Sequence, residues 1–268
     1  MTADPDRLVP PLFLAHGSPM LAITDMPARR FLGDLGRSLP RPRGIVILSP
    51  HWETDGLRVS APGPLRTIHD FGNFPRALFE IQYPASAPRD LVAEVVGLFD
   101  QAGLNPRLDD GWGLDHGAWV PLSLLYPDAD VPVVAVSLPL QAGPRDVLAL
   151  GRALEPLTRR GVLVVGSGST THNLRTLQPS GTPTAGWAQD FDRWLEEGIA
   201  AGDVDRLARL DDAPHFRLAH PTEEHLLPVF FPLGAAGADA AGELLHRSYD
   251  RGTLSMTYYR FVVPETVS

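Results

Sequence analysis

The sequence predicts an α/β fold, a single-domain sandwich with a central mixed, largely parallel sheet flanked by helices. Short apolar runs rich in β-branched residues alternate along the chain with amphipathic stretches of helical length, a pattern typical of strands and helices that follow each other in turn. The chain has 268 residues, of which 44% are hydrophobic, and this is enough for one sizeable core. It shows no internal repeat and no low-complexity linker. We therefore expect one domain over residues 1–268.

Four runs are almost continuously apolar, as expected of strands buried on both faces: Leu12–Ala15, Gly44–Ser49, Val131–Leu138 and Gly161–Val165. The stretches around them carry the amphipathic pattern of helices: Ala28–Leu39, Pro88–Ala102, Ala118–Tyr126 and Pro144–Arg160. Two of these stretches begin with proline, which suits the first turn of a helix because the N–H that it lacks would have no partner there. Strands that alternate with helices favour parallel pairing.

The last third of the chain predicts two more helices and a strand. Gly186–Ala201 and Pro221–Leu233 carry helical patterns, and we expect the second helix to be kinked or cut short at Pro228. Thr253–Val262 predicts a closing strand. Earlier in the chain, Arg76–Ile81 predicts a short helix.

The composition excludes several classes of protein. The net charge is -9 and there is no run of Lys or Arg, so we expect no binding to nucleic acid or to an anionic membrane surface. There are no cysteines, which rules out disulfides, thiolate zinc sites and iron–sulfur clusters and leaves His and carboxylates as metal ligands. No apolar run reaches the roughly 18–20 residues that span a bilayer. The stretch from Met1 to Pro11 lacks the pattern of a signal peptide, so we expect a soluble, cytoplasmic protein.

Three histidines follow predicted strands. His16 comes directly after the first apolar run, His51 comes after the second, and His172 comes shortly after the fourth. Ligands of open α/β sheets bind at the carboxyl ends of the strands, so these side chains are expected at one edge of the sheet. A single histidine at a strand end is more often a hydrogen-bonded structural residue than a ligand. Three histidines at equivalent places favour a shared metal site.

Two further histidines have local contexts that leave two interpretations open. His116 follows Asp115 at the start of a predicted helix; the carboxylate either orients the imidazole or belongs to a turn that caps the helix. His225 falls in the first two turns of the helix that is predicted to begin at Pro221, with His220 just outside it. It is either a ligand or part of a solvated helix face.

Several common catalytic motifs are absent. No helix carries the His-Glu-x-x-His pair of zinc proteases. The small-residue stretch 166–170 matches neither the Gly-x-Ser-x-Gly turn of serine hydrolases nor a phosphate-binding loop with Gly-Lys-Ser/Thr. The main sequence evidence for a classical serine hydrolase or a nucleotide-binding protein is therefore absent.

Seven blocks together resemble the 4,5-DOPA extradiol dioxygenases, which belong to the class III extradiol dioxygenases together with the catalytic subunit of protocatechuate 4,5-dioxygenase. The blocks are His-Gly-Ser-Pro-Met from His16, Ser-Pro-His-Trp from Ser49, Thr67–Pro75, Gly111–Gly117, His-Asn-Leu-Arg from His172, Pro221–Pro228 and Gly252–Met256. They occur in order over almost the whole chain. The resemblance implies an oxidoreductase that opens the rings of DOPA-like catechols with O₂ and yields a muconate semialdehyde.

The resemblance also implies roles for the histidines. His16, His51 and His225 are expected to bind non-haem Fe(II), with His225 where the wider class III group has a glutamate. His172 is expected to be the acid/base residue, with a role as a fourth ligand as its alternative, above all if Zn²⁺ binds. His116 is expected to be a second catalytic residue close to the metal. Zn²⁺ is a further expected occupant of the site in purified protein.

We also predict residues that bind the substrate. In the loop Thr67–Pro75, His69 is expected to contact a polar substituent of the catechol, while Phe71 and Phe74 either stack on the ring or fill the core beneath the loop. His220 is the second predicted substrate contact. The expected partners are a small catechol and O₂, with a monomer or a homodimer as the assembly. Two alternatives stay open: a zinc-dependent hydrolase that uses the same histidines, and a non-enzymatic binding protein on the same fold.

Overall fold

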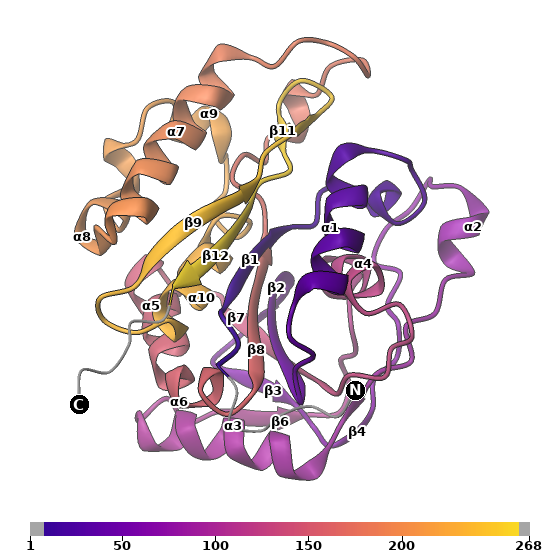
Figure 1. The fold of residues 1–268 in the computed structure, drawn as a ribbon, viewed down its shortest axis with the longest axis vertical. Helices are drawn as coiled ribbons and strands as arrows, with labels where there is room; N and C mark the ends of the chain where they lie inside the picture. Colours follow the sequence, from indigo (N-terminus) through magenta and orange to yellow (C-terminus); the bar gives the residue numbers. More distant parts are fainter. Residues whose placement is uncertain (1–7, 263–268) are drawn as a thin grey trace.

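A computed structural model describes residues 8–262, so the first seven residues of the N-terminal stretch Met1–Pro11, which shows no signal-peptide pattern, lie outside this range. An eight-stranded mixed sheet forms its centre, with the strand order β6-β3-β7-β2-β8-β1-β12-β9 (Figure 1). The four central strands are parallel to one another: β7 (Val133–Pro139), β2 (Gly44–Thr54), β8 (Val162–Gly168) and β1 (Leu12–Ala15). The predicted fold, a mixed sheet with a parallel centre, is confirmed.

The outer strands turn the parallel centre into a mixed sheet. On one side, β12 (Tyr258–Val262) is antiparallel to β1, and β9 (Ala241–His246) is antiparallel to β12. On the other side, β3 (Arg58–Ser60) meets β7 antiparallel, and β6 (Arg107–Asp109) pairs with β3. Two small two-stranded sheets lie outside this sheet: one pairs β4 (Gly63–Pro64) with β5 (Ser86–Ala87), and the other pairs β10 (Tyr249–Asp250) with β11 (Leu254–Ser255).

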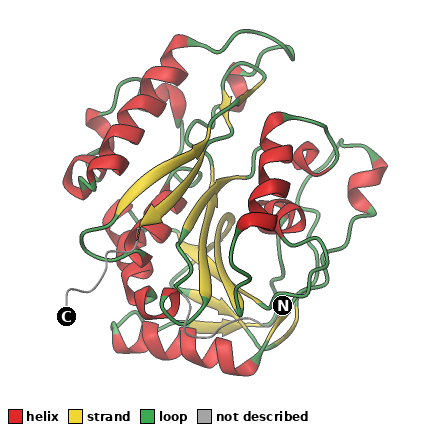
Figure 2. Cartoon of the chain, in the orientation of Figure 1, coloured by secondary structure: helices red, strands yellow, loops and turns green. Residues whose placement is uncertain are grey.

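Helices cover both faces of the sheet (Figure 2). The longer ones are α1 (Pro27–Ser38), α3 (Arg89–Gln101), α4 (His116–Leu125), α5 (Pro144–Ala153), α7 (Gly186–Ala201) and α10 (Phe230–Ala235). The short ones are α2 (Arg76–Phe79), α6 (Glu155–Thr158), α8 (Val204–Leu207), α9 (Phe216–Ala219) and the 3₁₀ helices η1 (Pro19–Ala22), η2 (Leu174–Thr176), η3 (Leu210–Asp212) and η4 (Leu227–Val229). Helix α4 packs on β2 and on α1, whereas α10 packs on β8 and on α5; the two pairs lie on opposite sides of the sheet in Figure 1.

The central strands are apolar because helices cover both of their faces. All four residues of β1 and all seven of β8 are buried, which explains why their sequences run apolar without alternation. They belong to a hydrophobic core that also includes Trp119 of α4 and Phe230 of α10. Full burial of such a side chain stabilises the fold by about 1.5–3 kcal/mol. The core therefore fixes the carboxyl ends of the central strands firmly.

Several predicted elements need correction. The helix expected over Pro144–Arg160 breaks at Leu154 into α5 and α6, because Pro156 cannot continue the hydrogen bonding of the preceding turn. The helix expected over Pro221–Leu233 is wrong in its first half: residues 221–226 form turns, and η4 and α10 follow. The closing strand over Thr253–Val262 is split into β11 and β12. Helix α7 has the predicted bounds, and no helix within residues 8–262 is long and apolar enough to cross a membrane.

Candidate metal centre

Five histidines from five segments meet at the carboxyl edge of the parallel strands. His16 directly follows β1, His51 lies in the last third of β2, and His116 is the first residue of α4. His172 lies in the loop after β8, and His225 lies in the turn before η4. The pairing of β2 with β7 shifts register between Leu48 and Glu53, so the irregular segment of β2 carries His51. The structure thus brings together the three strand-end histidines and adds His116 and His225.

His16, His51 and His225 form a compact triangle. The centroids of their rings lie 5.0 Å apart for His16 and His51, 5.5 Å for His16 and His225, and 5.0 Å for His51 and His225. The Nε2 atoms of His16 and His51 are 3.1 Å apart. Two nitrogens bound to one tetrahedral ion at about 2.0–2.1 Å would be roughly 3.4 Å apart, so this spacing suits a shared ion.

The hydrogen bonds on the other ring nitrogens fix how two of these histidines can act. Nδ1 of His16 lies 2.9 Å from Oγ of Ser167, and that hydroxyl donates its own proton to the carbonyl of Gly117. His16 must therefore donate from Nδ1, which leaves a lone pair on Nε2. Nδ1 of His225 donates to Oε1 of Glu224 at 2.9 Å, and its Nε2 is buried without a hydrogen-bond partner among the described residues. A buried nitrogen left with a free lone pair is what a metal ion would satisfy.

Burial keeps the triangle uncharged. Burial lowers the pKa of His16 and of His225 well below the ordinary 6.5, and the neighbouring histidines lower both further. It also lowers the pKa of His51 to about 3. Only the neutral imidazole has a lone pair for a metal. The three rings are therefore in the form that binds metal at neutral pH, and the donor set suits Fe(II) and Zn²⁺ alike.

Asp70 holds His116 against His51 and His16, with ring centroids 4.1 Å and 5.4 Å from that of His116. These three histidines offer ligand atoms within 4.8 Å of one another. One carboxylate oxygen accepts from Nδ1 of His116 at 2.9 Å, and the other accepts from its backbone N–H at 2.8 Å. Burial is the largest single effect and would raise the pKa of Asp70, but the hydrogen bonds from His116 and the charge interactions with His116 and His51 together outweigh it, and the net shift is downward. Asp115 instead accepts from Ser49 at 2.6 Å and from the backbone N–H of Ala118. The capping interpretation of Asp115 is confirmed, and the carboxylate that orients His116 is Asp70.

His172 stacks on His225. The two rings are 3.5 Å apart at an angle of 7°, and the backbone N–H of His172 donates to the carbonyl of Ala219 at 2.9 Å. Burial lowers the pKa of His172 to about 4. Together with Glu224, the two histidines offer ligand atoms within 4.8 Å of one another. The ring of His172 therefore lies beside the triangle and is neutral at pH 7.

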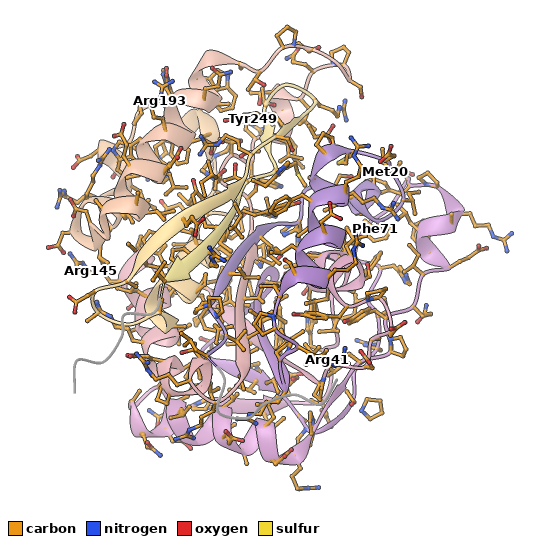
Figure 3. All side chains as sticks on the ribbon, viewed as in Figure 1. Met20, Arg41, Phe71, Arg145, Arg193 and Tyr249 are labelled. Carbon is orange, nitrogen blue, oxygen red and sulfur yellow. The ribbon has the colours of Figure 1, made fainter. Side chains whose placement is uncertain are left out.

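A cavity of about 600 Å³ opens on the histidines, a volume typical of small-molecule sites. Its lining is Gly17, Ser18, Pro19, Met20, Thr24, Met26, His51, Phe71, Phe74, His116, His172, Leu174, Leu177, Ser180, His225, Asp250, Arg251 and Leu254. Met20 and Phe71, both labelled in Figure 3, are among these lining residues. The ring of Phe71 is 5.8 Å from that of His116. A flat apolar molecule can thus lie against Phe71 with one end at the histidines.

His69 and His220, the two predicted substrate contacts, do not line this cavity. His69 donates from Nε2 to the carbonyl of Ile81 at 3.0 Å and packs against Phe71, Phe79 and Trp119. His220 is fully buried and donates to the carbonyl of Thr170 at 2.9 Å. Both imidazoles satisfy backbone carbonyls. Their positions support structural roles behind the cavity wall.

Sequence reasoning missed three polar residues of the site, namely Asp70, Ser167 and Glu224. Each contacts a histidine through its side chain. Asp70 and Glu224 lie inside the blocks that carry the family resemblance, and this is the sequence feature that could have identified them. A motif does not show which side chains form hydrogen bonds with each other. Ser167 sits in a run of small residues and has no local signal at all.

Comparisons with known proteins agree with this geometry. The family model described as the catalytic LigB subunit of aromatic ring-opening dioxygenase matches residues 10–262. The chain is 38% identical to a 4,5-DOPA dioxygenase extradiol of Beta vulgaris over 96% of this chain and 97% of that protein. It is also 38% identical to the protein of the same name from Escherichia coli (strain K12), over 92% and 93%. A crystal structure of an uncharacterized protein from Escherichia coli K12 superposes with a TM-score of 0.79 at 32% identity, over 94% of this chain and 99% of that one.

Proposed function

Because the chain belongs to the family of the catalytic LigB subunit of aromatic ring-opening dioxygenases, we propose that it cleaves DOPA-like catechols at a non-haem Fe(II) bound by His16, His51 and His225. The protein is an oxidoreductase of the extradiol ring-opening class. The proposal for the metal rests on one observation above all. The ring of His225, with a buried Nε2 that has no hydrogen-bond partner among the described residues, lies 5.0–5.5 Å, centroid to centroid, from the rings of His51 and His16, and the Nε2 atoms of those two face each other at 3.1 Å.

The histidines fit a ferrous ion that works on a catechol. Fe(II), when bound, supplies open positions for two catechol oxygens and for O₂. Three neutral imidazoles hold such an ion without filling those positions. The all-histidine set also suits Zn²⁺, which is the metal of the alternative function, a hydrolase.

His172 and His116 are proposed to handle protons. His172 is neutral at pH 7 because burial lowers its pKa, so a ring nitrogen can accept the proton of a catechol hydroxyl and later return it. His116 donates from Nδ1 to Asp70, so Nε2 is the ring atom left to contact a second hydroxyl. Both rings line the cavity.

The apolar wall is proposed to bind the aromatic ring. Phe71 and Phe74 line the cavity at 5.3 Å from each other, and they exclude water around a bound catechol. The curated relatives are named for DOPA, so DOPA-like catechols are the proposed substrates. Both atoms of O₂ enter the product, a muconate semialdehyde, and no other reductant is needed.

Oxygen uptake tests the proposal directly. The metal-free protein is reconstituted anaerobically with Fe(II) and mixed with L-DOPA in an oxygen electrode, and the absorption of a semialdehyde is followed in parallel. We expect one O₂ consumed per catechol. Protein loaded with Zn²⁺ that hydrolyses esters or amides, while the Fe(II) protein consumes no O₂ with any catechol, would establish the hydrolase instead. A cytoplasmic location and a monomeric or homodimeric assembly remain predictions.

A further inference from the structure

Two side chains of opposite charge, Asp250 and Arg251, stand in the otherwise uncharged wall of the cavity. Apart from the histidines, they are the titratable residues of that lining. Neither forms a salt bridge with another residue of the described range 8–262. Many other arginines of this range form salt bridges with carboxylates, as Arg247 does with Glu196 at 2.8 Å. Adjacent positive and negative side chains that line a ligand cavity without other charged partners point to a ligand that carries both charges.

The local structure holds Arg251 in place. The residue lies in the turn between β10 and β11 with a φ of 48°, in the left-handed region that non-glycine residues seldom adopt. Its backbone carbonyl accepts from the N–H of Gln178 at 2.9 Å, and its Nε donates to the carbonyl of Gln178 at 3.1 Å. Both Nη groups stay without a partner among the described residues. The backbone bond fixes the turn, and the bond from Nε orients the guanidinium and leaves both Nη groups available to a carboxylate.

Asp250 is held in place through Tyr249, its neighbour in β10. Tyr249 donates its hydroxyl proton to Asp192 at 2.6 Å, which ties β10 to α7. Burial raises the pKa of the Asp250 carboxyl, against the opposing effect of Arg251. A partly desolvated carboxylate gains more from an added cation than an exposed one does.

We propose that Asp250 and Arg251 bind the amino-acid end of the substrate, with Arg251 on the α-carboxylate and Asp250 on the α-ammonium group. This inference rests on the proposed function, because the cavity must accept a catechol whose hydroxyls face the histidines. The ring then lies along Phe71 and Phe74, and its zwitterionic substituent reaches the β10–β11 turn. The role predicted for His69 thus falls to a different segment, because His69 is occupied by the carbonyl of Ile81.

Four catechols separate the two contacts. L-DOPA carries both charged groups, 3-(3,4-dihydroxyphenyl)propionate carries the carboxylate alone, dopamine carries the ammonium group alone, and 4-methylcatechol carries neither. The variants are Arg251→Gln and Asp250→Asn, with Arg145→Gln as the matched control. Arg145 is an exposed arginine that pairs with Asp205 at 2.7 Å and lies on the far side of the molecule from Phe71 (Figure 3).

For each variant, KM and kcat are measured by oxygen uptake, and Kd is measured by anaerobic titration calorimetry on the Fe(II) holoenzyme. Arg251→Gln is expected to raise KM and Kd about 10-fold for L-DOPA and for the propionate, which carry a carboxylate, and to leave both constants unchanged for dopamine and 4-methylcatechol. The factor is about 10 because a hydrogen bond to a charged group at a partly exposed site contributes binding free energy at the lower end of the usual range. Asp250→Asn is expected to do the same for L-DOPA and dopamine. The kcat for 4-methylcatechol should stay at the wild-type value, and Arg145→Gln should change nothing.

Equal changes for all four catechols, or none for L-DOPA in either variant, would overturn the inference. Failure of the proposed function looks different. In that case the wild-type holoenzyme consumes no O₂ with any of the four catechols. Calorimetry then still tests the pair, because the dependence of L-DOPA binding on Arg251 and Asp250 is measured without turnover.

Discussion

Gly117 is the residue at which a single added methyl group should disturb the proposed metal site. It is the second residue of α4, it is buried, and its carbonyl accepts the hydroxyl of Ser167 that positions His16. A Cβ at this position would lie 2.5 Å from Oγ of Ser49 and 2.9 Å from Cδ2 of His51. Gly117→Ala therefore presses directly on one proposed ligand and on the support of another.

The size of the effect follows from these contacts. Non-bonded carbon atoms prefer separations of about 3.5–4.0 Å, so the ring of His51 must move by roughly 0.5–1 Å. Ser49 cannot simply turn away, because its hydroxyl donates to Asp115 at 2.6 Å, and Asp115 also caps α4. Overpacking of this kind costs about 1–3 kcal/mol of the free energy of unfolding. A displaced ligand should weaken metal binding by about 10–100-fold, the usual loss when the support of a ligand is removed.

Gly97→Ala is the matched control. Gly97 lies within α3, and a Cβ there has no neighbour within 4 Å, so alanine should stabilise the helix by about 0.5–1 kcal/mol. The Kd for Zn²⁺ and for Fe(II) is measured by competition with a chromophoric chelator, and stability is measured by urea unfolding of the metal-free protein. A Gly117→Ala protein that is less stable yet binds both metals as tightly as the wild type would refute the reasoning.

Three further predictions concern individual side chains. His16→Ala should abolish metal binding, whereas His172→Ala should keep most of the metal and lose about 10²–10⁴-fold in kcat; metal content and kcat are measured on the same samples, and equal metal loss would make His172 a ligand. Glu224→Ala should weaken metal binding about 10–100-fold by releasing Nδ1 of His225, and Glu224→Gln, which keeps an acceptor oxygen, should lose clearly less. His220 has its pKa lowered from 6.5 to about 4 by burial, so as the pH falls below about 6.5 the unfolded chain takes up this proton first and the native state loses stability. The destabilisation caused by His220→Gln in the metal-free protein should therefore be about 2 kcal/mol smaller at pH 5 than at pH 7 in urea unfolding, and the same destabilisation at both pH values would contradict this.

The central strands were predictable because burial on both faces leaves a continuous apolar run in the sequence. The outer strands carry no such mark. All six residues of β9 are at least partly exposed, and β6 has two exposed residues out of three. Such strands form because a neighbouring strand has unpaired backbone N–H and C=O groups. The position of those groups depends on the folded sheet rather than on the local sequence.

The position of His225 shows how a site can be predicted through a wrong local structure. The segment from Pro221 was expected to be helical, but it is held as a turn by a long-range bond, in which the backbone N–H of Ser169 donates to the carbonyl of His225 at 2.8 Å. A Cβ on Gly168 would lie 2.3 Å from the same carbonyl. Glycine therefore lets the turn approach the end of β8, where His16 also stands. The family resemblance predicted a site that His225 shares with His16 and His51, and its ring does lie beside theirs. Local helix propensity does not include the long-range contact that places it there.

The carboxylate that orients His116 could not be identified among its neighbours in the sequence, and the reason is geometric. Asp115 precedes His116 directly, but a residue at the N-cap turns its side chain toward the backbone N–H groups of the first helical turn, and Asp115 does so with Ala118. The partner of the first helical side chain must then come from another segment, and Asp70 supplies it from 46 positions away. Because the same carboxylate also lies 3.6 Å from Nδ1 of His51, one residue of the loop 67–75 contacts both a proposed ligand and a proposed proton carrier. This loop also carries Phe71, so the ring-binding wall and the support of the histidines are a single structural unit.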